Sequence, residues 1–265
     1  MGIISRLAAE PPFRLISKVV VKTFATRLGT LSRWDAVDRP HYLFGLLHAA
    51  AQTRREGKSS FSAIEFGVAE GYGLLALQAH SAAVTKETGI GIDVFGFDTG
   101  SGLPKTCGDY RDHPDHWQAG DFQMDIDGLR RKLLPGTELV IGNVASTVLE
   151  QGFTSSIGFI SFDLDFYSST IQAFRLFSRQ DVGFLRRVGA YFDDINDSHN
   201  HSFAGELLAI DEFNGTNDWF RIDPWRGIRY GRPFPEAKWL DRMFLIHNLK
   251  AISATKLNRM PARLH

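Results

Sequence analysis

Residues 64–73 read Ile-Glu-Phe-Gly-Val-Ala-Glu-Gly-Tyr-Gly, an apolar strand that runs into a glycine-rich turn and then a helix. Gly67, Gly71 and Gly73 remove side chains where the backbone must approach a bound ligand closely. Glu65 stands at the end of the strand, where a carboxylate can meet a hydroxyl or an ammonium group. Such a turn occurs in many nucleotide-binding proteins, so its meaning depends on the residues at the other strand ends of the chain.

Strands and helices alternate on both sides of this turn. We predict strands over 62–67, 91–98, 138–142, 157–165 and 188–195, and strand-like segments over 219–222 and 242–248. Helices are predicted over 71–86, 125–134, 145–151, 168–177 and 203–213, whereas 99–124 shows no clear period. Strands that alternate with helices predict an α/β fold with a doubly wound, mostly parallel sheet that helices cover on both faces.

Two further helices are predicted before the sheet, over 12–28 and about 40–55. The chain therefore divides into an N-terminal helical extension, residues 1–57, and a main ligand-binding domain, residues 58–265. The helix over 12–28 is amphipathic, so it either packs on the domain or a second subunit, or contacts a membrane or another partner. The second helix could likewise support a homodimer.

The composition of the 265 residues narrows the function classes. Thirty basic and thirty acidic residues cancel, so no excess of positive charge indicates a nucleic-acid partner. Cys107 is the single cysteine, which excludes an internal disulfide and fits a reducing compartment. No stretch approaches the roughly 20 apolar residues of a membrane span, and the N-terminus lacks a signal-peptide pattern. The expected location is the cytoplasm.

Small and acidic residues gather where the predicted strands end. The residues at five consecutive strand ends are Glu65–Gly67, Asp98, Gly142-Asn143, Asp163-Leu-Asp165 and Asp193-Asp194. In a doubly wound sheet, ligands bind outside the carboxyl ends of the strands. These strand ends therefore predict the mouth of a binding site.

Asp98 follows the second strand, the usual position of a carboxylate that accepts both hydroxyls of a ribose. Together with Glu65 and the glycine turn, it indicates a cofactor that contains adenosine. The alternative is that Asp98 is a turn residue that opens the run Asp98-Thr-Gly-Ser-Gly102. The glycine spacing departs from G-x-G-x-x-G, which speaks against a dinucleotide, so the cofactor is expected to lack a phosphate bridge.

Aspartates form the second half of the predicted site. Asp163 and Asp165 alternate along one predicted strand and so project to one side, and Asp193 and Asp194 stand at the tip of the next strand. Carboxylates that converge repel one another unless a cation or shared protons compensate. Oxygen ligands favour a hard divalent ion such as Mg²⁺, Mn²⁺ or Ca²⁺, so the four aspartates are predicted metal ligands, with Asp163 or Asp165 joining Asp193 and Asp194. The other interpretation is that one aspartate caps a helix and another bonds only backbone.

Several of these segments resemble known methyltransferases. Glu65-x-Gly67-x-x-x-Gly71 is similar to the first motif of class I S-adenosylmethionine-dependent methyltransferases. Four further segments resemble motifs of the macrocin O-methyltransferase family, TylF and MycF: Gly96-Phe-Asp98-Thr-Gly-Ser-Gly102-Leu-Pro104, Phe162-Asp-Leu-Asp165-Phe-Tyr-Ser-Ser-Thr170, Tyr191-Phe-Asp-Asp194 and Met243-Phe-Leu-Ile-His247-Asn. The matches extend from about residue 62 to residue 248.

The resemblance implies a Rossmann-like methyltransferase fold, S-adenosylmethionine as cofactor, and Mg²⁺-dependent O-methyl transfer to a hydroxyl of a sugar or another small molecule. The predicted cofactor contacts are Glu65, Phe66, Gly67, Glu70, Gly71, Tyr72, Asp98, Thr99, Asn143 and Asp163. The sequence departs from the family at Thr99-Gly100, which replaces a usual Phe, and in the segment 113–122, which matches none of its motifs. The acceptor therefore stays undefined.

Methyl transfer from a sulfonium needs little acid–base help, so the main task is to hold the acceptor oxygen in line and exclude water. The predicted catalytic residues are Asp163, through the metal, and His199 as general base. The alternative for His199 is a solvated turn residue. His113, His116 and Trp117 are predicted to form either a lid over the acceptor or an ordinary surface loop.

Three other functions compete with methyl transfer. A nicotinamide oxidoreductase is disfavoured by the glycine spacing and by the absence of a Tyr-x-x-x-Lys pair after Tyr167 or Tyr191. A metal-dependent hydrolase would use the aspartates but leave Glu65, Gly71 and Asp98 without a purpose. A binding or scaffold protein that keeps the fold and the cofactor without turnover stays open.

Overall fold

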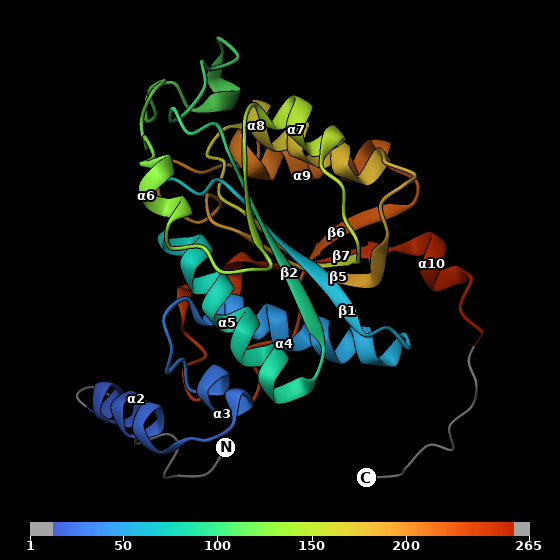
Figure 1. Cartoon of the computed structure of the whole chain (residues 1–265). Helices are drawn as coiled ribbons and strands as arrows, with labels where there is room; N and C mark the ends of the chain where they lie inside the picture. Colours follow the sequence, from blue (N-terminus) through green and yellow to red (C-terminus); the bar gives the residue numbers. More distant parts are fainter. Residues whose placement is uncertain (1–12, 257–265) are drawn as a thin grey trace.

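The computed structural model of the protein describes residues 13–256. Within this range the chain forms a seven-stranded sheet in the order β3-β2-β1-β4-β5-β7-β6 (Figure 1). The strands are β1 Ser60–Phe66, β2 Gly91–Asp98, β3 Thr137–Ile141, β4 Ser156–Phe162, β5 Phe184–Phe192, β6 Phe220–Pro224 and β7 Met243–Asn248. Strands β1 to β5 pair in parallel, whereas β7 runs antiparallel to both β5 and β6. The predicted mostly parallel α/β fold is confirmed.

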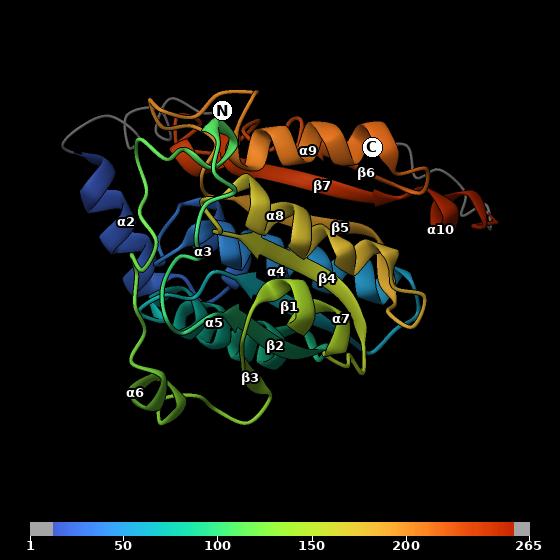
Figure 2. The same cartoon turned by 90° about the horizontal axis from the view of Figure 1, so that it is seen from above.

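Helices cover both faces of the sheet. They are α2 Phe13–Phe24, α3 Leu28–Arg33, α4 Pro40–Arg55, α5 Tyr72–Thr88, α6 Ile126–Arg130, α7 Val144–Glu150, α8 Tyr167–Ala173, α9 Gly205–Thr216 and α10 Leu249–Ser253. Short 3₁₀ turns span Tyr110–Asp112, Phe174–Ser178 and Lys238–Arg242. Helices α4 and α5 lie on one face and α7, α8 and α9 on the other (Figures 1 and 2).

Helix α4 packs directly on the sheet. Gly45 lies so close to β4 that a Cβ at this position would be 2.2 Å from the ring of Phe159. Tyr42, Leu43 and Leu46 of the same helix are fully buried. The division of the chain at residue 57 remains a prediction, and the helix just before that boundary supplies part of the cover of the sheet.

Aromatic side chains fill much of the opposite face. The ring of Phe162 stacks between Phe66, at 5.4 Å between centroids, and Phe192, at 4.6 Å. All three side chains are fully buried, and Phe174 meets the ring of Phe162 edge-on at 5.3 Å. Offset and edge-to-face contacts of this kind stabilise a core beyond the area they bury. Phe66 was predicted as a cofactor contact, but its side chain belongs to this buried layer.

Several predicted boundaries differ from the structure, and two of the differences change the interpretation. Strand β4 ends at Phe162, so Asp163 and Asp165 lie in the loop after the strand and do not alternate along it. Asp165 has a positive φ of 57°, a left-handed conformation that no strand residue adopts. The predicted helix over 12–28 is interrupted, because α2 ends at Phe24 and α3 begins at Leu28. Among residues 13–256, no helix combines the length and apolar character that a membrane crossing needs.

Candidate functional site

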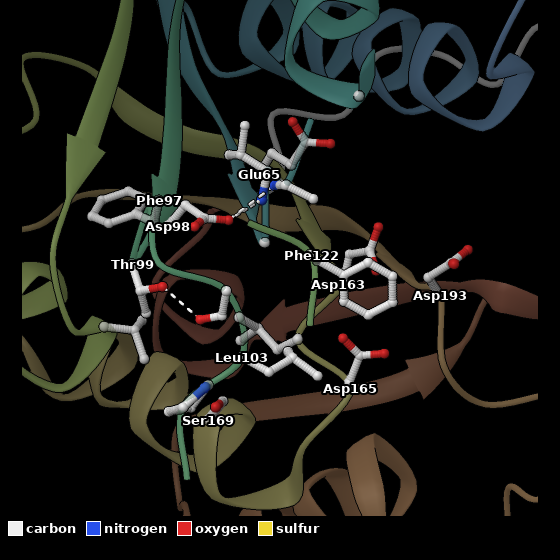
Figure 3. Close-up of a pocket in the computed structure, with 18 of the residues that line it drawn as sticks. Glu65, Phe97, Asp98, Thr99, Leu103, Phe122, Asp163, Asp165, Ser169 and Asp193 are labelled. Carbon is white, nitrogen blue, oxygen red and sulfur yellow. Dashed lines mark hydrogen bonds between the residues drawn. The ribbon is translucent and has the colours of Figure 1, made fainter. Parts of the chain in front are cut away.

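A cavity of about 500 Å³ lies at the carboxyl ends of the parallel strands, within the size range of small-molecule sites. The predicted site residues that line it are Glu65, Gly67, Glu70, Tyr72, Asp98, Thr99, Asn143, Asp163, Asp165, Asp193 and Asp194. Figure 3 shows Asp98 and Thr99 on one side of the cavity and Asp163, Asp165 and Asp193 on the other. The strand ends therefore meet as the sequence pattern predicted.

The glycine turn fits between two strands. Gly67 has a φ of 82°, and its N–H donates to the carbonyl of Phe97 at 2.9 Å. A Cβ on Gly67 would lie 1.7 Å from the carbonyl oxygen of Asp163, so no other residue fits here without a backbone shift. Gly71 precedes α5 and packs against Leu129 instead of lining the cavity.

Asp98 organises the glycine turn. Its Oδ2 accepts hydrogen bonds from the N–H groups of Val68 and Ala69, each at 2.9 Å, and its Oδ1 accepts from Gly100 at 2.7 Å. The carboxylate thus joins the end of β2 to the turn after β1, which fits the turn-residue alternative. It also lines the cavity, and a carboxylate has further lone pairs with which it can accept ligand hydroxyls.

Glu65 is a nearly fully buried carboxyl group at the cavity, 1% exposed. The hydroxyl of Tyr42 donates to its Oε1 at 2.5 Å, and its Oε2 has no hydrogen-bond partner among the described residues. Burial raises the pKa of Glu65 to about 7, while the Tyr42 hydrogen bond and the nearby Arg39 guanidinium act in the opposite direction. An unpaired, buried carboxylate oxygen at a cavity suits a cationic or hydrogen-bond-donating ligand group.

Three aspartates converge on the other side. One carboxylate oxygen from each of Asp163, Asp193 and Asp194 lies within 4.8 Å of the others, whereas Asp165 lies outside this group. Burial, and next the charge of Asp194, raise the pKa of Asp163 well above its ordinary value. The pKa of Asp194 is raised as well, first by burial and then by Asp193. An oxygen-only donor set with this mutual repulsion fits a hard divalent cation, which would relieve it.

Three side chains outside the predicted site form hydrogen bonds with Asp193 and Asp194. The Arg242 guanidinium donates to Oδ1 of Asp193 at 2.6 Å, and the Tyr191 hydroxyl donates to the same oxygen at 2.7 Å. The Asp194 N–H donates to Glu206 at 3.1 Å. Glu206 is fully buried, and its other oxygen has no partner among the described residues. Burial, and then the charge of Asp194, raise the pKa of Glu206.

The irregular segment 99–124 covers part of the cavity. Asp112, fully buried, fastens it to α8 by accepting from the N–H of Ser168 at 2.8 Å and from the Ser168 hydroxyl at 2.7 Å. Trp117 and Phe122 of the same segment line the cavity, with their ring centroids 5.4 Å apart. Of the three residues predicted to form a lid or a surface loop, Trp117 therefore lines the cavity, whereas His113 and His116 do not.

The histidines lie beside the cavity and not in its lining. The ring of His199 stacks on His116 with 3.7 Å between centroids, and its Nε2 is buried without a hydrogen-bond partner in the described chain. His113 meets both His199 and His201 edge-on. Burial, and next the neighbouring His116, lower the pKa of His199, so the ring is neutral near pH 7 and can accept a proton.

Comparisons with known proteins agree with the fold. No family model and no curated protein matches the chain. CalS11, described as a calicheamicin methyltransferase, aligns with a TM-score of 0.51 and 20% identity over 86% of this chain and 93% of its own. The chain has the Rossmann-like methyltransferase fold. The O-methyltransferase NovP aligns with a TM-score of 0.49 and 13% identity over 79% of each chain.

Two site residues come from the segment before the first strand. Arg39 lines the cavity, and Tyr42 holds Glu65 while also reaching Ser161 at 3.1 Å. Neither belongs to a motif that the sequence contains. The Arg39-Pro40 pair marks only a helix start, and the reach of both side chains into the site depends on how α4 packs on the sheet.

Proposed function

We propose that this protein is an enzyme that transfers a methyl group from S-adenosylmethionine to a hydroxyl of a small molecule or sugar, assisted by a divalent cation. The observation that carries the proposal is that one cavity is lined by both the glycine turn and the converging aspartates. A hydrolase would need the aspartates alone. A cofactor-binding turn and an acidic group that face each other suit a transfer between two bound molecules.

The turn side of the cavity suits the cofactor. Backbone at Gly67 and Val68 leaves room for a ligand to lie close, and Asp98 and Asn143 line the same end. The unpaired oxygen of Glu65 provides an acceptor for an ammonium or hydroxyl group. When bound, S-adenosylmethionine supplies an activated methyl group on a sulfonium, and the residues on this side of the cavity fix its position.

The acidic side suits the cation and the acceptor. Asp163, Asp193 and Asp194 would hold a divalent ion such as Mg²⁺, which when bound lowers the pKa of a neighbouring hydroxyl. Arg242 fixes the orientation of Asp193, and Glu206 that of the Asp194 backbone. Trp117 and Phe122 exclude water above the reacting groups.

We further propose His199 as the group that takes the acceptor proton. Its neutral ring has an unpaired nitrogen, although it lies beside the cavity in this structure. The role requires that the segment around His116 and His199 shifts toward a bound acceptor. The same proposal has three parts that rest on the sequence alone: membership in the macrocin O-methyltransferase family, a cytoplasmic location and a homodimer.

Calorimetric titration of the metal-stripped protein with S-adenosylmethionine tests the cofactor half. We expect micromolar binding that weakens at least about tenfold in Asp98→Ala, because both the ligand contact and the shape of the turn are lost. The exposed Asp211→Ala is the matched control and should bind normally. Absence of binding by the wild-type protein, with or without Mg²⁺, would overturn the proposal and favour a metal-dependent hydrolase.

Product formation tests the transfer half. We expect mass-spectrometric detection of a methylated product, from a panel of hydroxylated sugars and phenols, to depend on Mg²⁺ and to be lost in Asp194→Asn. His199→Gln should lower kcat and leave cofactor binding unchanged. Cofactor binding without transfer to any acceptor would favour a binding or scaffold protein.

A further inference from the structure

Helix α2 presents an apolar face to solvent. Within the described residues 13–256, none of the twelve residues of this helix is buried. The exposed apolar side chains range from 47% to 77% exposure, and they are Phe13, Leu15, Ile16, Val19, Val20 and Phe24. On a helical wheel these six side chains lie within one half of the helix circumference, an apolar arc that also contains Thr23. A contiguous exposed apolar surface of this kind marks a site of contact with a partner or a lipid surface.

The polar side of the helix faces the protein body. The Arg14 guanidinium lies 4.8 Å from the ring centroid of Phe234, and the Lys18 ammonium lies 5.2 Å from the same centroid. Burial lowers the pKa of Lys18, which agrees with its position against the body. These cation–π contacts fix how the helix is rotated, so the apolar arc is held outward.

The charged residues of this segment are all of one sign. Residues 13–34 contain five basic residues and no acidic residue, in a chain whose net charge is zero: Arg14, Lys18, Lys22, Arg27 and Arg33. Lys22, Arg27 and Arg33 are exposed. We propose that α2 docks this protein onto an anionic membrane surface, with its apolar arc inserted among the lipids and the exposed Lys22, Arg27 and Arg33 at the headgroups.

Charge distinguishes this surface from a homodimer interface. In a two-fold symmetric dimer the same patch meets itself, so the basic residues of one copy would face those of the other. No acidic residue within 13–34 could compensate them. Anionic headgroups supply the missing opposite charge. Figure 2 shows α2 at the edge of the molecule to which the carboxyl ends of the parallel strands point.

Vesicle co-sedimentation of the full-length protein tests the proposal. We expect binding to phosphatidylcholine vesicles that contain phosphatidylserine, weaker binding to phosphatidylcholine alone, and loss of binding at high salt. Val19→Glu combined with Phe24→Glu should weaken binding by at least about tenfold, because charge replaces the inserted apolar groups. Lys22→Gln should weaken it about fivefold, the effect of one basic residue near an anionic surface.

Leu134→Glu is the matched control, since Leu134 is an exposed aliphatic residue outside α2, at 55% exposure. This variant should bind vesicles like the wild-type protein. Absence of binding to anionic vesicles, or equal binding by the α2 double variant, would overturn the proposal. A wild-type dimer in analytical ultracentrifugation that the α2 double variant dissociates would also overturn it, because the face would then be an interface between copies. None of these readouts requires cofactor or turnover.

Discussion

Removing the hydroxyl of Tyr42 should destabilise the protein in a pH-dependent way. Tyr42→Phe keeps the ring in the core and deletes the hydroxyl that donates a hydrogen bond to Glu65 Oε1 at 2.5 Å. Since Glu65 is buried and its other oxygen lacks a partner among the described residues, the ionised carboxylate would lose a hydrogen bond that its surroundings do not replace. A hydrogen bond to a charged group contributes about 1.5–3 kcal/mol to the free energy of unfolding, and a neutral one about 0.5–1.5 kcal/mol.

The pKa of Glu65, about 7, decides which of these two hydrogen-bond energies applies at a given pH. At pH 8 the carboxyl is mostly ionised, so we expect Tyr42→Phe to lower Tm by about 3–12 °C, at roughly 2–4 °C per kcal/mol for a chain near this size. At pH 5.5 it is protonated, and the expected loss is only about 1–6 °C. Calorimetry of both proteins without added ligand, at both pH values, measures the difference.

Tyr167→Phe is the control for deleting a tyrosine hydroxyl. Tyr167 donates to Glu212 at 2.6 Å, but this pair is exposed, so its removal should change Tm little at either pH. Glu65→Gln, which keeps an acceptor for Tyr42 without a charge, should abolish the pH dependence of the Tyr42→Phe effect. Equal losses of Tm at pH 8 and pH 5.5 for Tyr42→Phe would refute the reasoning.

Mg²⁺ at about 100 times its Kd should raise Tm by roughly 5–11 °C at pH 8. It should do so less at pH 6, because the raised pKa values of Asp163 and Asp194 let protons compete; an equal shift at both pH values would contradict this. Gly67→Ala should lower the free energy of unfolding, measured with urea, by more than about 4 kcal/mol. Gly89→Ala should lower it by only about 1–2 kcal/mol, because a Cβ at Gly89 would meet no atom within 4 Å. Asp112→Asn should speed proteolytic cleavage within 99–124, and unchanged cleavage would mean that other contacts hold this segment. Glu65→Gln should also remove part of the pH profile of urea unfolding, and a profile unchanged in the variant would mean that other groups, such as the aspartates, produce it.

The sign of this last effect comes from the two pKa values of Glu65. Its folded pKa, about 7, lies above its ordinary value of 4.5, so the folded protein keeps a proton that the unfolded chain releases. The stability that Glu65 contributes is therefore fully present below about pH 4.5 and is lost as the pH rises through 7.

Local patterns in the sequence were sufficient for the sheet. Apolar strands separated by helices can be buried only in a parallel sheet with two covered faces, so the ends of β1 to β5 had to share one edge. This is why Glu65, Asp98 and Asp163 could be predicted to meet at one mouth. The prediction was wrong where it extended β4 past Phe162, because the chain turns there and the Asp165 N–H donates to Asp194, a residue distant in the sequence.

The sequence was sufficient to predict the α/β class, the order of the elements along the chain and the strand ends that carry carboxylates. It was sufficient because hydrophobic periodicity and glycine placement are local properties. The choice of side chains that enter the cavity depended instead on packing between distant segments. Arg39 lines the cavity and Tyr42 holds Glu65 because α4 packs at the distance that Gly45 permits. Phe66 is turned away because its face of the sheet is filled by aromatic rings. The rotation of α2 has the same origin, since contacts with Phe234, far along the chain, hold the apolar arc outward.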